Sequence, residues 1–458
     1  MTSLFTSNPS HSDPSSHSDT ASSSVLQQLF APLHSFLAQA SHQYLCHKLS
    51  DLDWIHTGVL RALDDQPSGC AFLQKLSLSL QPTSTLGKSH FFESCKSQRR
   101  LRHLQALNDD FTQSQSRKAL PSVSKKAGIP ELTSVGLASV ADGLNHYLKD
   151  FHLYAGDGHF HAACSHDLPL GSKGKAAVGH LYALNLRTQF LSHLAFGNET
   201  GKEKPNDMEV LKRLTHKQLR QGAGKGEKVL YIWDRAGIDF RFWHALKQSS
   251  GIYFLSRTKT NMKLEHPLPV AYETNDPLNA GVLADEWVSH SQGGMIRRVC
   301  YVLPETGEKM SFMTNLGEHI PPGIVVHLYW MRWRIEKAFD EVKNKLGESK
   351  AWAKSGTAKK MQAQFIALAY NLGQLLHREI VGREALRNGN NEKKRELRQK
   401  ELEEMVRKEH RQLPLLRMLV EEVTQLGVKF YRWLRHEIYH ASPWPLALDH
   451  LKHIYAHF

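Results

Sequence analysis

The sequence predicts an α/β fold in which helices pack on a mixed β-sheet, with further helical regions before and after it. Three observations lead to this prediction. Residues 151–259 alternate short apolar runs with helical periodicity, residues 25–148 repeat apolar side chains every three to four positions, and a segment rich in alanine and leucine begins near residue 358. Segments that alternate strand and helix patterns in this way form a layered sheet with helices on its faces.

The first 150 residues divide into a tail and a helical region. Residues 1–25 are rich in serine, histidine and aspartate, so we expect a disordered tail. Residues 26–150 are predicted to be helical and contain two basic clusters, "KSQRRLRH" (96–103) and "SRKALPSVSKKAG" (116–128). Either cluster can be a solvated helix face or a DNA contact. The net charge of +13, from 58 Lys and Arg against 45 Asp and Glu, favours binding to a polyanion without proving it.

The central region, 151–259, is predicted to form the first part of the α/β core. Strands are expected at 151–160, 177–188, 190–198, 229–234 and 251–259. A helix "DMEVLKRLTHKQLRQ" should begin after Pro205 at Asp207, and a second, "GIDFRFWHALKQ", lies between the last two strands. The order is three strands, helix, strand, helix, strand.

The remaining chain divides into three predicted regions. Residues 260–320 form a β-rich insertion that contains a hairpin with its turn at Pro304 to Gly307. Residues 321–380 return to helix and complete the core. Residues 381–458 form a charged helical region, in which the segment 384–411 is either solvated or faces a partner, and we expect it to support dimerisation.

Composition narrows the class of protein. No apolar run reaches the roughly 20 residues needed to cross a membrane, and we expect no secretory signal. The five cysteines are scattered without a CxxC pair, which indicates a reduced, cytoplasmic protein.

The stretch "YWMRWRIEKAFDEVKNKLG" (329–347) carries the strongest chemical signal. On one helix, Tyr329, Arg332, Glu336 and Lys343 fall within about 60° of one another. An apolar stripe of Ile335, Phe339, Val342 and Leu346 adjoins them. An ordinary amphipathic helix with charge pairs would give the same pattern. Asp340 lies near the same face, so the helix alone does not choose between Glu336 and Asp340.

Two acids in the predicted strands change this balance. Asp157 lies in "YAGDGHF" and Asp234 ends "VLYIWD". Carboxylates in apolar strands are costly to bury unless they are paired or bind a metal. Together with a helix carboxylate they could hold two Mg²⁺ ions, which prefer oxygen ligands, and a two-metal site suits phosphodiester chemistry.

Tyr329, Arg332, Glu336 and Lys343 stand at the spacing of the Tyr-Arg-Glu-Lys signature. With "GDGHFHAACSHD" and "VLYIWDRAG", the chain resembles the insertion-sequence-four family of Asp-Asp-Glu transposases over about residues 151–376. His159 departs from the hydroxyl residue that several relatives carry there. The separations, 77 residues from Asp157 to Asp234 and 102 from Asp234 to Glu336, fit a β-strand insertion before the glutamate.

The resemblance implies a ribonuclease-H-like core with Asp157, Asp234 and Glu336 as catalytic residues and ligands of two Mg²⁺ ions, for which Mn²⁺ can substitute. It implies that Tyr329, Arg332 and Lys343 contact double-stranded DNA at the transposon end. A flipped base stacks on a tryptophan in some relatives, and the candidates here are Trp287, Trp330 and Trp333. Arg235 either orients Asp234 or contacts DNA.

Other patterns are weaker. His159, His161 and His166 lack the usual spacing of a zinc site, and "GAGKG" (222–226) lacks the phosphate-binding pattern, so we expect no nucleotide cofactor. Asp239 is predicted to cap the helix that follows it.

The sequence therefore predicts a cut-and-paste transposase of an insertion sequence. It would bind terminal inverted repeats and target DNA as a homodimer. We expect no membrane partner, and we expect the protein to act in the bacterial cytoplasm, at the nucleoid. The alternatives are a catalytically silent DNA-binding derivative and a ribonuclease-H-like nuclease without strand transfer.

Overall fold

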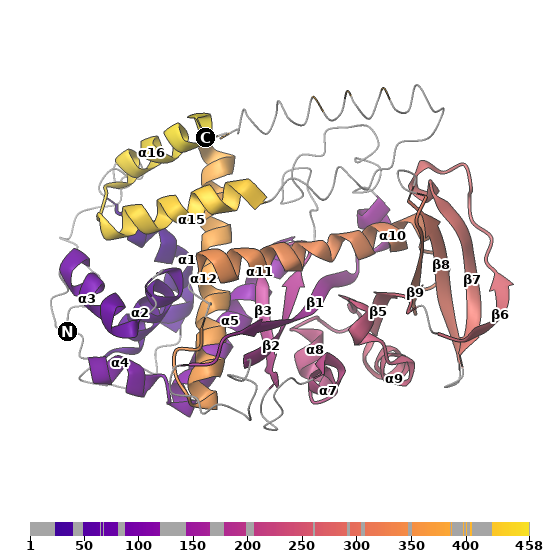
Figure 1. The fold of residues 1–458 in the computed structure, drawn as a ribbon, viewed down its shortest axis with the longest axis horizontal. Helices are drawn as coiled ribbons and strands as arrows, with labels where there is room; N and C mark the ends of the chain where they lie inside the picture. Colours follow the sequence, from indigo (N-terminus) through magenta and orange to yellow (C-terminus); the bar gives the residue numbers. More distant parts are fainter. Residues whose placement is uncertain are drawn as a thin grey trace.

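A computed structural model describes most of the chain (Figure 1). The described residues are 23–39, 49–64, 66, 68–80, 88–119, 143–164, 178–197, 206–259, 262–290, 294–303, 307–346, 350–384, 386, 397, 400, 404 and 424–457. The predicted tail at 1–25 lies almost entirely outside them. Most of the second basic cluster and of the charged segment 384–411 also lies outside them.

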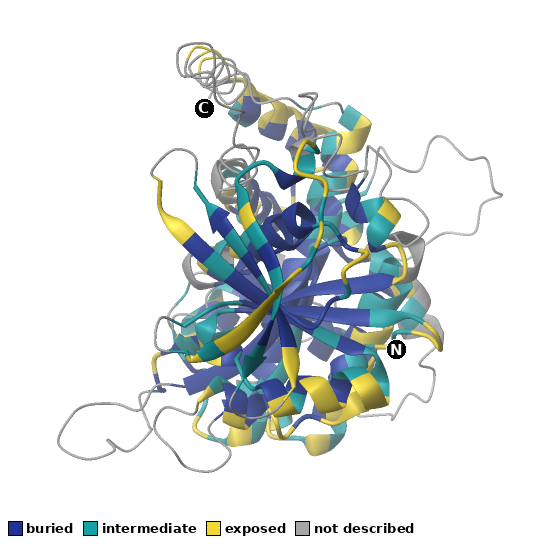
Figure 2. Ribbon diagram, turned by 90° about the vertical axis from the view of Figure 1, so that its right-hand side faces the viewer, coloured by how far each residue is buried: buried dark blue, intermediate teal, exposed yellow. Residues whose placement is uncertain are grey.

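Nine strands form one mixed sheet in the spatial order β3-β2-β1-β4-β5-β9-β8-β7-β6. The first five strands along the chain are β1 (Phe151–His161), β2 (Val178–Asn185), β3 (Leu191–Phe196), β4 (Lys228–Trp233) and β5 (Ile252–Arg257). β1 pairs antiparallel with β2 and parallel with β4, and β4 pairs parallel with β5. The predicted α/β fold with five core strands is confirmed. β1, β2 and β4 are largely buried, whereas β6 is largely exposed (Figure 2).

The region 260–320 extends the same sheet. Its strands are β6 (Leu264–Pro269), β7 (Val282–His290), β8 (Met295–Val302) and β9 (Lys309–Thr314), all antiparallel to their neighbours. β8 and β9 form the predicted hairpin, and β9 also pairs with β5. The β-rich segment is therefore built onto the edge of the core sheet through β9.

Helices flank the sheet and gather at one end of the molecule. Their bounds are α1 (Val25–Gln39), α2 (Asp51–Leu63), α3 (Gly69–Leu80), α4 (Lys88–Ser94), α5 (Gln98–Ala119), α7 (Asp207–Leu211), α8 (His216–Arg220), α9 (Phe240–Ser250), α10 (Pro322–Met331), α11 (Trp333–Lys345), α12 (Gly356–Glu384), α15 (Thr424–Tyr439) and α16 (Trp444–His457). Short 3-10 turns, η4 (Arg235–Gly237) and η5 (Pro277–Asn279), follow β4 and precede β7. α1–α5, α15 and α16 surround α12 at the end opposite β6–β9 (Figure 1).

The helix predicted after Pro205 is wrong as a single element. It divides into α7 and α8, because Thr215 forms a capping box with Gln218 and starts a new helix. Asn206 caps α7, and Gln221, in the left-handed region at φ 45°, ends α8. Local side-chain hydrogen bonds thus overrode the continuous helical periodicity.

The helix predicted over 329–346 is also divided, at Arg332. The Arg332 N–H bonds to the Tyr329 carbonyl three residues back, although its φ of −56° and ψ of −34° are helical. The turn tightens without reversing direction, and α10 and α11 run on in line (Figure 1). The predicted face therefore persists across the junction.

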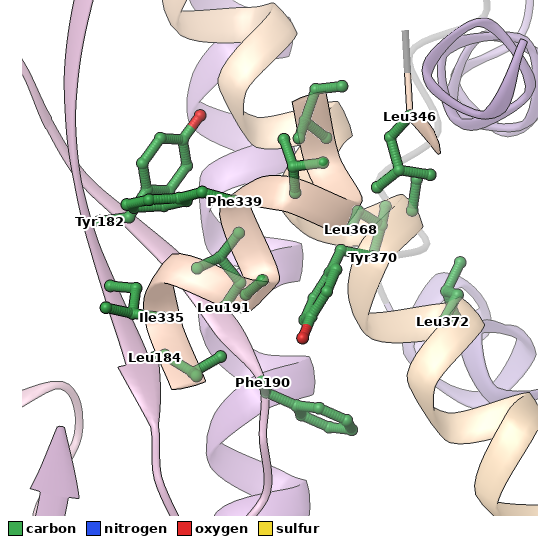
Figure 3. Packing of buried hydrophobic residues seen from close by; sticks show 14 of the residues in the cluster. Tyr182, Leu184, Phe190, Leu191, Ile335, Phe339, Leu346, Leu368, Tyr370 and Leu372 are labelled. Atoms are coloured by element: carbon green, nitrogen blue, oxygen red, sulfur yellow. The ribbon is translucent and has the colours of Figure 1, made fainter. Parts of the chain in front are cut away.

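The apolar stripe of α11 is buried as predicted. Ile335, Val342 and Leu346 are fully buried, and Phe339 lies against Tyr182 of β2 with ring centroids 5.7 Å apart. α11 thus packs on β1 and β2, and α12, which packs on β3, contributes Leu368 and Leu372 to the same cluster (Figure 3). This packing holds the polar edge of α11 over the sheet.

α10 is fixed against the β-rich segment. Most of α10 is buried, and Pro322 occupies its first turn, where the missing N–H costs nothing. Gly323 lies so close to the backbone of Leu278 that a Cβ there would meet the Leu278 carbonyl oxygen at 1.6 Å. The backbone of η5 therefore supports the start of the helix that leads to the polar face.

Candidate active site

Asp157 and Asp234 lie at the same level of two adjacent strands. The parallel register pairs Ala155 with Ile232, so two residues further along each strand the two acids are neighbours on one face. One oxygen of each carboxylate accepts a backbone N–H, from Gly158 for Asp157 and from Ala236 for Asp234, both at 2.8 Å. Two carboxylates, each held by a backbone N–H, therefore lie side by side on β1 and at the end of β4.

α11 adds an arginine and a third carboxylate. Arg332 donates to Glu336 Oε1 at 2.6 Å through one terminal nitrogen and to Asp157 Oδ2 at 3.4 Å through the other. Arg332 is buried, whereas the Glu336 side chain is 42% exposed. Asp340 is exposed, and no contact between it and Asp157, Asp234 or Arg332 is found in the described part of the chain. The geometry therefore associates Glu336, and not Asp340, with the strand acids.

The pKa values of the site residues are shifted in the direction that favours bound protons and positive charge. Burial raises the pKa of Asp157 to about 7, and the nearby Asp234 carboxylate adds to the rise, while Arg332 opposes it. Burial would lower the pKa of Arg332, but Glu336, Tyr329 and Asp157 together raise it above its usual value. Burial also raises the pKa of Tyr329. The carboxylates around Asp157 thus lie close together where water is partly excluded.

The donor chemistry fits a hard divalent cation. Asp157 and Asp234 lie beside each other where β4 ends, and the Arg332 guanidinium contacts both Asp157 and Glu336. Carboxylate oxygens are the ligands that Mg²⁺ prefers. Within the described ranges, however, no three Asp, Glu, His or Cys side chains converge as they stand on a single metal position. Asp157 and Glu336 bind opposite arms of Arg332 instead of facing a common centre.

The other predicted DNA contacts are distributed around this cluster. Tyr329 is buried, with the Arg332 guanidinium 5.8 Å from the centre of its ring, and Trp330 is partly buried beside it. Trp333 is 42% exposed. Trp287 lies in β7 and donates its indole N–H to Glu318. The Lys343 side chain lies outside the described residues.

Arg235 follows Asp234 in η4 and is partly buried. No ion pair or hydrogen bond of its side chain is found within the described part of the chain. Its two roles, orientation of Asp234 and contact with DNA, both stay predictions.

Sequence reasoning missed two charged residues near the cluster. Arg257 follows Ser256, which pairs with Trp233, so it stands beside Asp234 on the next strand, and it binds Glu308 at 2.9 Å. Asp207 lies against Gly158, within 2.6 Å of the place a Cβ would take. The in-register ends of adjacent parallel strands could have indicated Arg257. Nothing local in the sequence indicates Asp207.

The weaker patterns have structural roles. The Asp239 side chain accepts the N–H of Phe242, which confirms the predicted cap of α9. His159 and His161 are buried in the sheet, with His159 against Phe339, and His166 lies outside the described residues. The segment 222–226 is a loop between α8 and β4.

Part of the first basic cluster is used to hold the N-terminal helices together. Arg99 donates to both oxygens of Asp51, at 2.8 and 2.9 Å. Arg100 is buried and binds Asp51 and the Leu49 carbonyl. These two arginines therefore serve helix packing.

None of the helices that the structure describes is both long enough and apolar enough to span a bilayer. The described cysteines, Cys70, Cys95, Cys164 and Cys300, are free thiols.

Comparison with protein families gives one match. Residues 153–372 match the transposase DDE domain. No curated protein matches the chain. The matched range begins in β1 and ends in α12, so it contains both strand acids and the whole of α10 and α11. The mixed sheet flanked by helices is consistent with the ribonuclease-H-like fold of DDE transposases, and the match supports a transposase of this class.

A DDE domain indicates a metal-dependent enzyme that cleaves DNA, and DDE transposases generally use divalent metal ions. The assignment to the insertion-sequence-four family and its Tyr-Arg-Glu-Lys signature is finer than this match and stays a prediction.

Proposed function

We propose that the chain is the transposase of an insertion sequence, which binds terminal inverted repeats and carries out Mg²⁺-dependent cut-and-paste transposition. The observation that carries the proposal is that Arg332 bridges Asp157 and Glu336, while Asp234 lies beside Asp157 on the neighbouring strand. These residues come from β1, β4 and α11, and Arg332 contacts both Asp157 and Glu336.

Asp157, Asp234 and Glu336 would hold two Mg²⁺ ions, or Mn²⁺ in their place. Bound there, the metal ions would activate the nucleophile and stabilise the leaving oxygen of a phosphodiester. The backbone N–H groups of Gly158 and Ala236 fix one oxygen of each aspartate and so hold both carboxylates toward the same side of the sheet.

The chemistry would proceed in two displacements. In the first, water attacks the phosphodiester at the end of the element, the bond to the 3′ oxygen breaks, and a 3′-hydroxyl is released. In the second, that hydroxyl attacks a phosphodiester of the target, and a new 3′ oxygen leaves. Because Arg332 is 7% and Asp157 19% exposed, their electrostatic interactions with a bound phosphodiester would be stronger than in bulk water.

Basic and aromatic residues around the acids would position the DNA. Tyr329, Arg332 and Lys343 would contact the backbone near the cut, and Arg235 and Arg257 border the same strand ends. Exposed Trp333 is the best placed of the three tryptophans to stack on an extruded base, because Trp330 is partly buried and Trp287 is bound to Glu318. A homodimer would hold both DNA ends, using the N-terminal helices for end recognition and the C-terminal region for dimerisation. It would act on the bacterial nucleoid in the cytoplasm.

The test is Mg²⁺-dependent cleavage of a labelled duplex that carries the element's own terminal repeat. Wild type is compared with Glu336→Ala and with Asp340→Ala, a matched acid one turn along α11. Loss of a metal ligand should reduce cleavage by more than about a hundredfold, since even outer-shell changes cost about 10 to 100-fold. Asp340→Ala should cleave like wild type.

Equal cleavage by wild type and Glu336→Ala would remove the catalytic assignment. Loss confined to Asp340→Ala would move the third ligand by one turn. DNA binding without cleavage in wild type would favour the silent derivative, and cleavage without joining would favour a nuclease.

A further inference from the structure

Arg332 occupies the place where the three acids would share a cation. Its two terminal nitrogens bind Glu336 Oε1 at 2.6 Å and Asp157 Oδ2 at 3.4 Å. The Gly158 N–H already holds the other oxygen of Asp157. The Asp157 oxygen that a cation would take is therefore the one that faces the guanidinium.

The Arg332 guanidinium and a divalent cation would compete for these oxygens as the side chains lie here. Mg²⁺ binds carboxylate oxygens at about 2.0–2.1 Å, in a nearly ideal octahedral arrangement. A guanidinium between the same two carboxylates keeps them apart, and its positive charge would repel the ion strongly in a partly desolvated site. Binding of the ion to both Asp157 and Glu336 would therefore be favoured when Arg332 moves away from them.

The contacts of Arg332 are suited to such a move. The contact with Asp157 is long, and Glu336 lies at the exposed edge of α11. The Arg332 Nε is buried and makes no hydrogen bond within the described part of the chain. The guanidinium is therefore incompletely satisfied where it lies, and a phosphate, which arginine binds with two parallel hydrogen bonds, would be a better partner.

We propose that Arg332 is a built-in competitor of the divalent cation, and that a DNA phosphate releases the site by drawing Arg332 away. This inference rests on the proposed function. It adds that DNA binding and metal binding reinforce each other through one side chain, so the nuclease site is completed only on DNA. By linkage, each ligand strengthens the other by the same factor.

The first experiment measures Mn²⁺ binding to the whole protein by electron paramagnetic resonance, without DNA. Arg332→Ala should bind Mn²⁺ at least about tenfold more tightly than wild type, within the usual range of coupling between sites. Arg334→Ala is the matched control, because it removes a positive charge from the same helix, where Arg334 contacts the Leu186 carbonyl, without opening the Asp157–Glu336 pair. It should change the affinity by less than about threefold.

The second experiment repeats the titration with a duplex carrying the element's terminal sequence. Wild type should gain Mn²⁺ affinity on DNA, and Arg332→Ala should gain little, because its competitor is already absent. Arg332→Met, which keeps the length and much of the packing of the side chain, should behave like Arg332→Ala. Thermal unfolding of each variant establishes that it is folded.

The outcomes separate the two proposals. Unchanged or weaker Mn²⁺ binding by both Arg332 variants, or the same gain on DNA as in wild type, would overturn the competitor role and leave the proposed function standing. If neither wild type nor the Arg332 variants bind Mn²⁺, or if Glu336→Ala and Asp157→Ala bind it as wild type does, the carboxylate site itself fails and both proposals fall.

Discussion

Two arginines in this molecule each bind carboxylate, and they differ in how completely they are satisfied. In the β-rich segment, Arg297 binds both oxygens of Asp285 at 2.8 and 2.6 Å, and both side chains are 0% exposed. Arg297 also donates to the carbonyls of Gly317 and Ile320. Arg332 has one short and one long contact with carboxylates, an interaction with Tyr329, and an Nε that makes no hydrogen bond in the described part of the chain.

The difference separates a structural ion pair from a functional one. A buried pair in which all three guanidinium nitrogens are hydrogen-bonded has no better partner to move to. It ties β7 and β8 to the loop that leads into α10. An incompletely bonded arginine beside Asp157, whose pKa is raised, can exchange partners, which is what a site that binds both metal and DNA would require.

The largest expected effect is loss of the structural pair. Arg297→Ala leaves Asp285 buried without a counter-charge, so the free energy of unfolding should fall by about 3–5 kcal/mol. Chemical denaturation would measure the change. Arg298→Ala, which breaks the more exposed pair with Glu286 on the same strand, should cost at most about 1 kcal/mol.

Arg332→Ala should cost far less stability than Arg297→Ala, because Glu336 is partly exposed and Asp157 can take up a proton. If Arg332→Ala lowered the free energy of unfolding as much as Arg297→Ala does, both arginines would be structural and the distinction between them would be wrong.

The second-largest expected effect is a loss of folding stability at low pH, caused by buried histidines. Burial lowers the pKa of His327 and His377 to about 4 and that of His56 to about 3. The unfolded chain takes up these protons below about pH 6.5 while the folded chain does not. Stability should therefore be full above pH 6.5 and fall as the pH is lowered toward 4, by up to about 3 kcal/mol for His327.

Thermal midpoints between pH 4.5 and 8 would test this. His327→Asn removes one titrating group from α10 and should flatten the decline. An unchanged slope would show that His327 is protonated in the folded protein at the same pH as in the unfolded chain.

Asp157 should behave in the opposite sense. Its pKa of about 7 lies above the unfolded value of 3.8, so the folded state holds the proton more tightly. Its contribution is greatest at low pH and is lost as the pH rises from about 4 through 7. Asp157→Asn should therefore raise stability at pH 8, by about 1–2 kcal/mol, and change it little at pH 5. Destabilisation at pH 8 would show that Asp157 serves the fold, as Asp285 does.

The smallest effect is expected at a helix cap. Asp239→Ala removes the acceptor for the Phe242 N–H and the 2.5 Å pair with Lys212, so it should cost about 1 kcal/mol. Asp239→Asn keeps the cap and should recover most of the loss in thermal midpoint. Cleavage activity should be equal in all three proteins, since this cap lies outside the acid cluster.

The sequence by itself determined the elements and the chemistry they carry. Period-two and period-3.6 patterns are local, so they gave the strands around Asp157 and Asp234 and the buried stripe of α11. Where a local hydrogen bond competes with periodicity, as at Thr215, the pattern failed. The tightened turn at Arg332 likewise carries no signal in the apolar spacing.

Only the tertiary structure decided which charged groups meet. On α11, Glu336 and Asp340 are equivalent by angle, and the packing of Ile335 and Phe339 on the sheet places Glu336 near Asp157 and leaves Asp340 in solvent. The same is true of the two arginines, because Arg297 is satisfied by carbonyls 20 and 23 residues away. Contacts between distant segments depend on the order of strands in the sheet and on how the helices pack on it. The local spacing of apolar residues predicts neither.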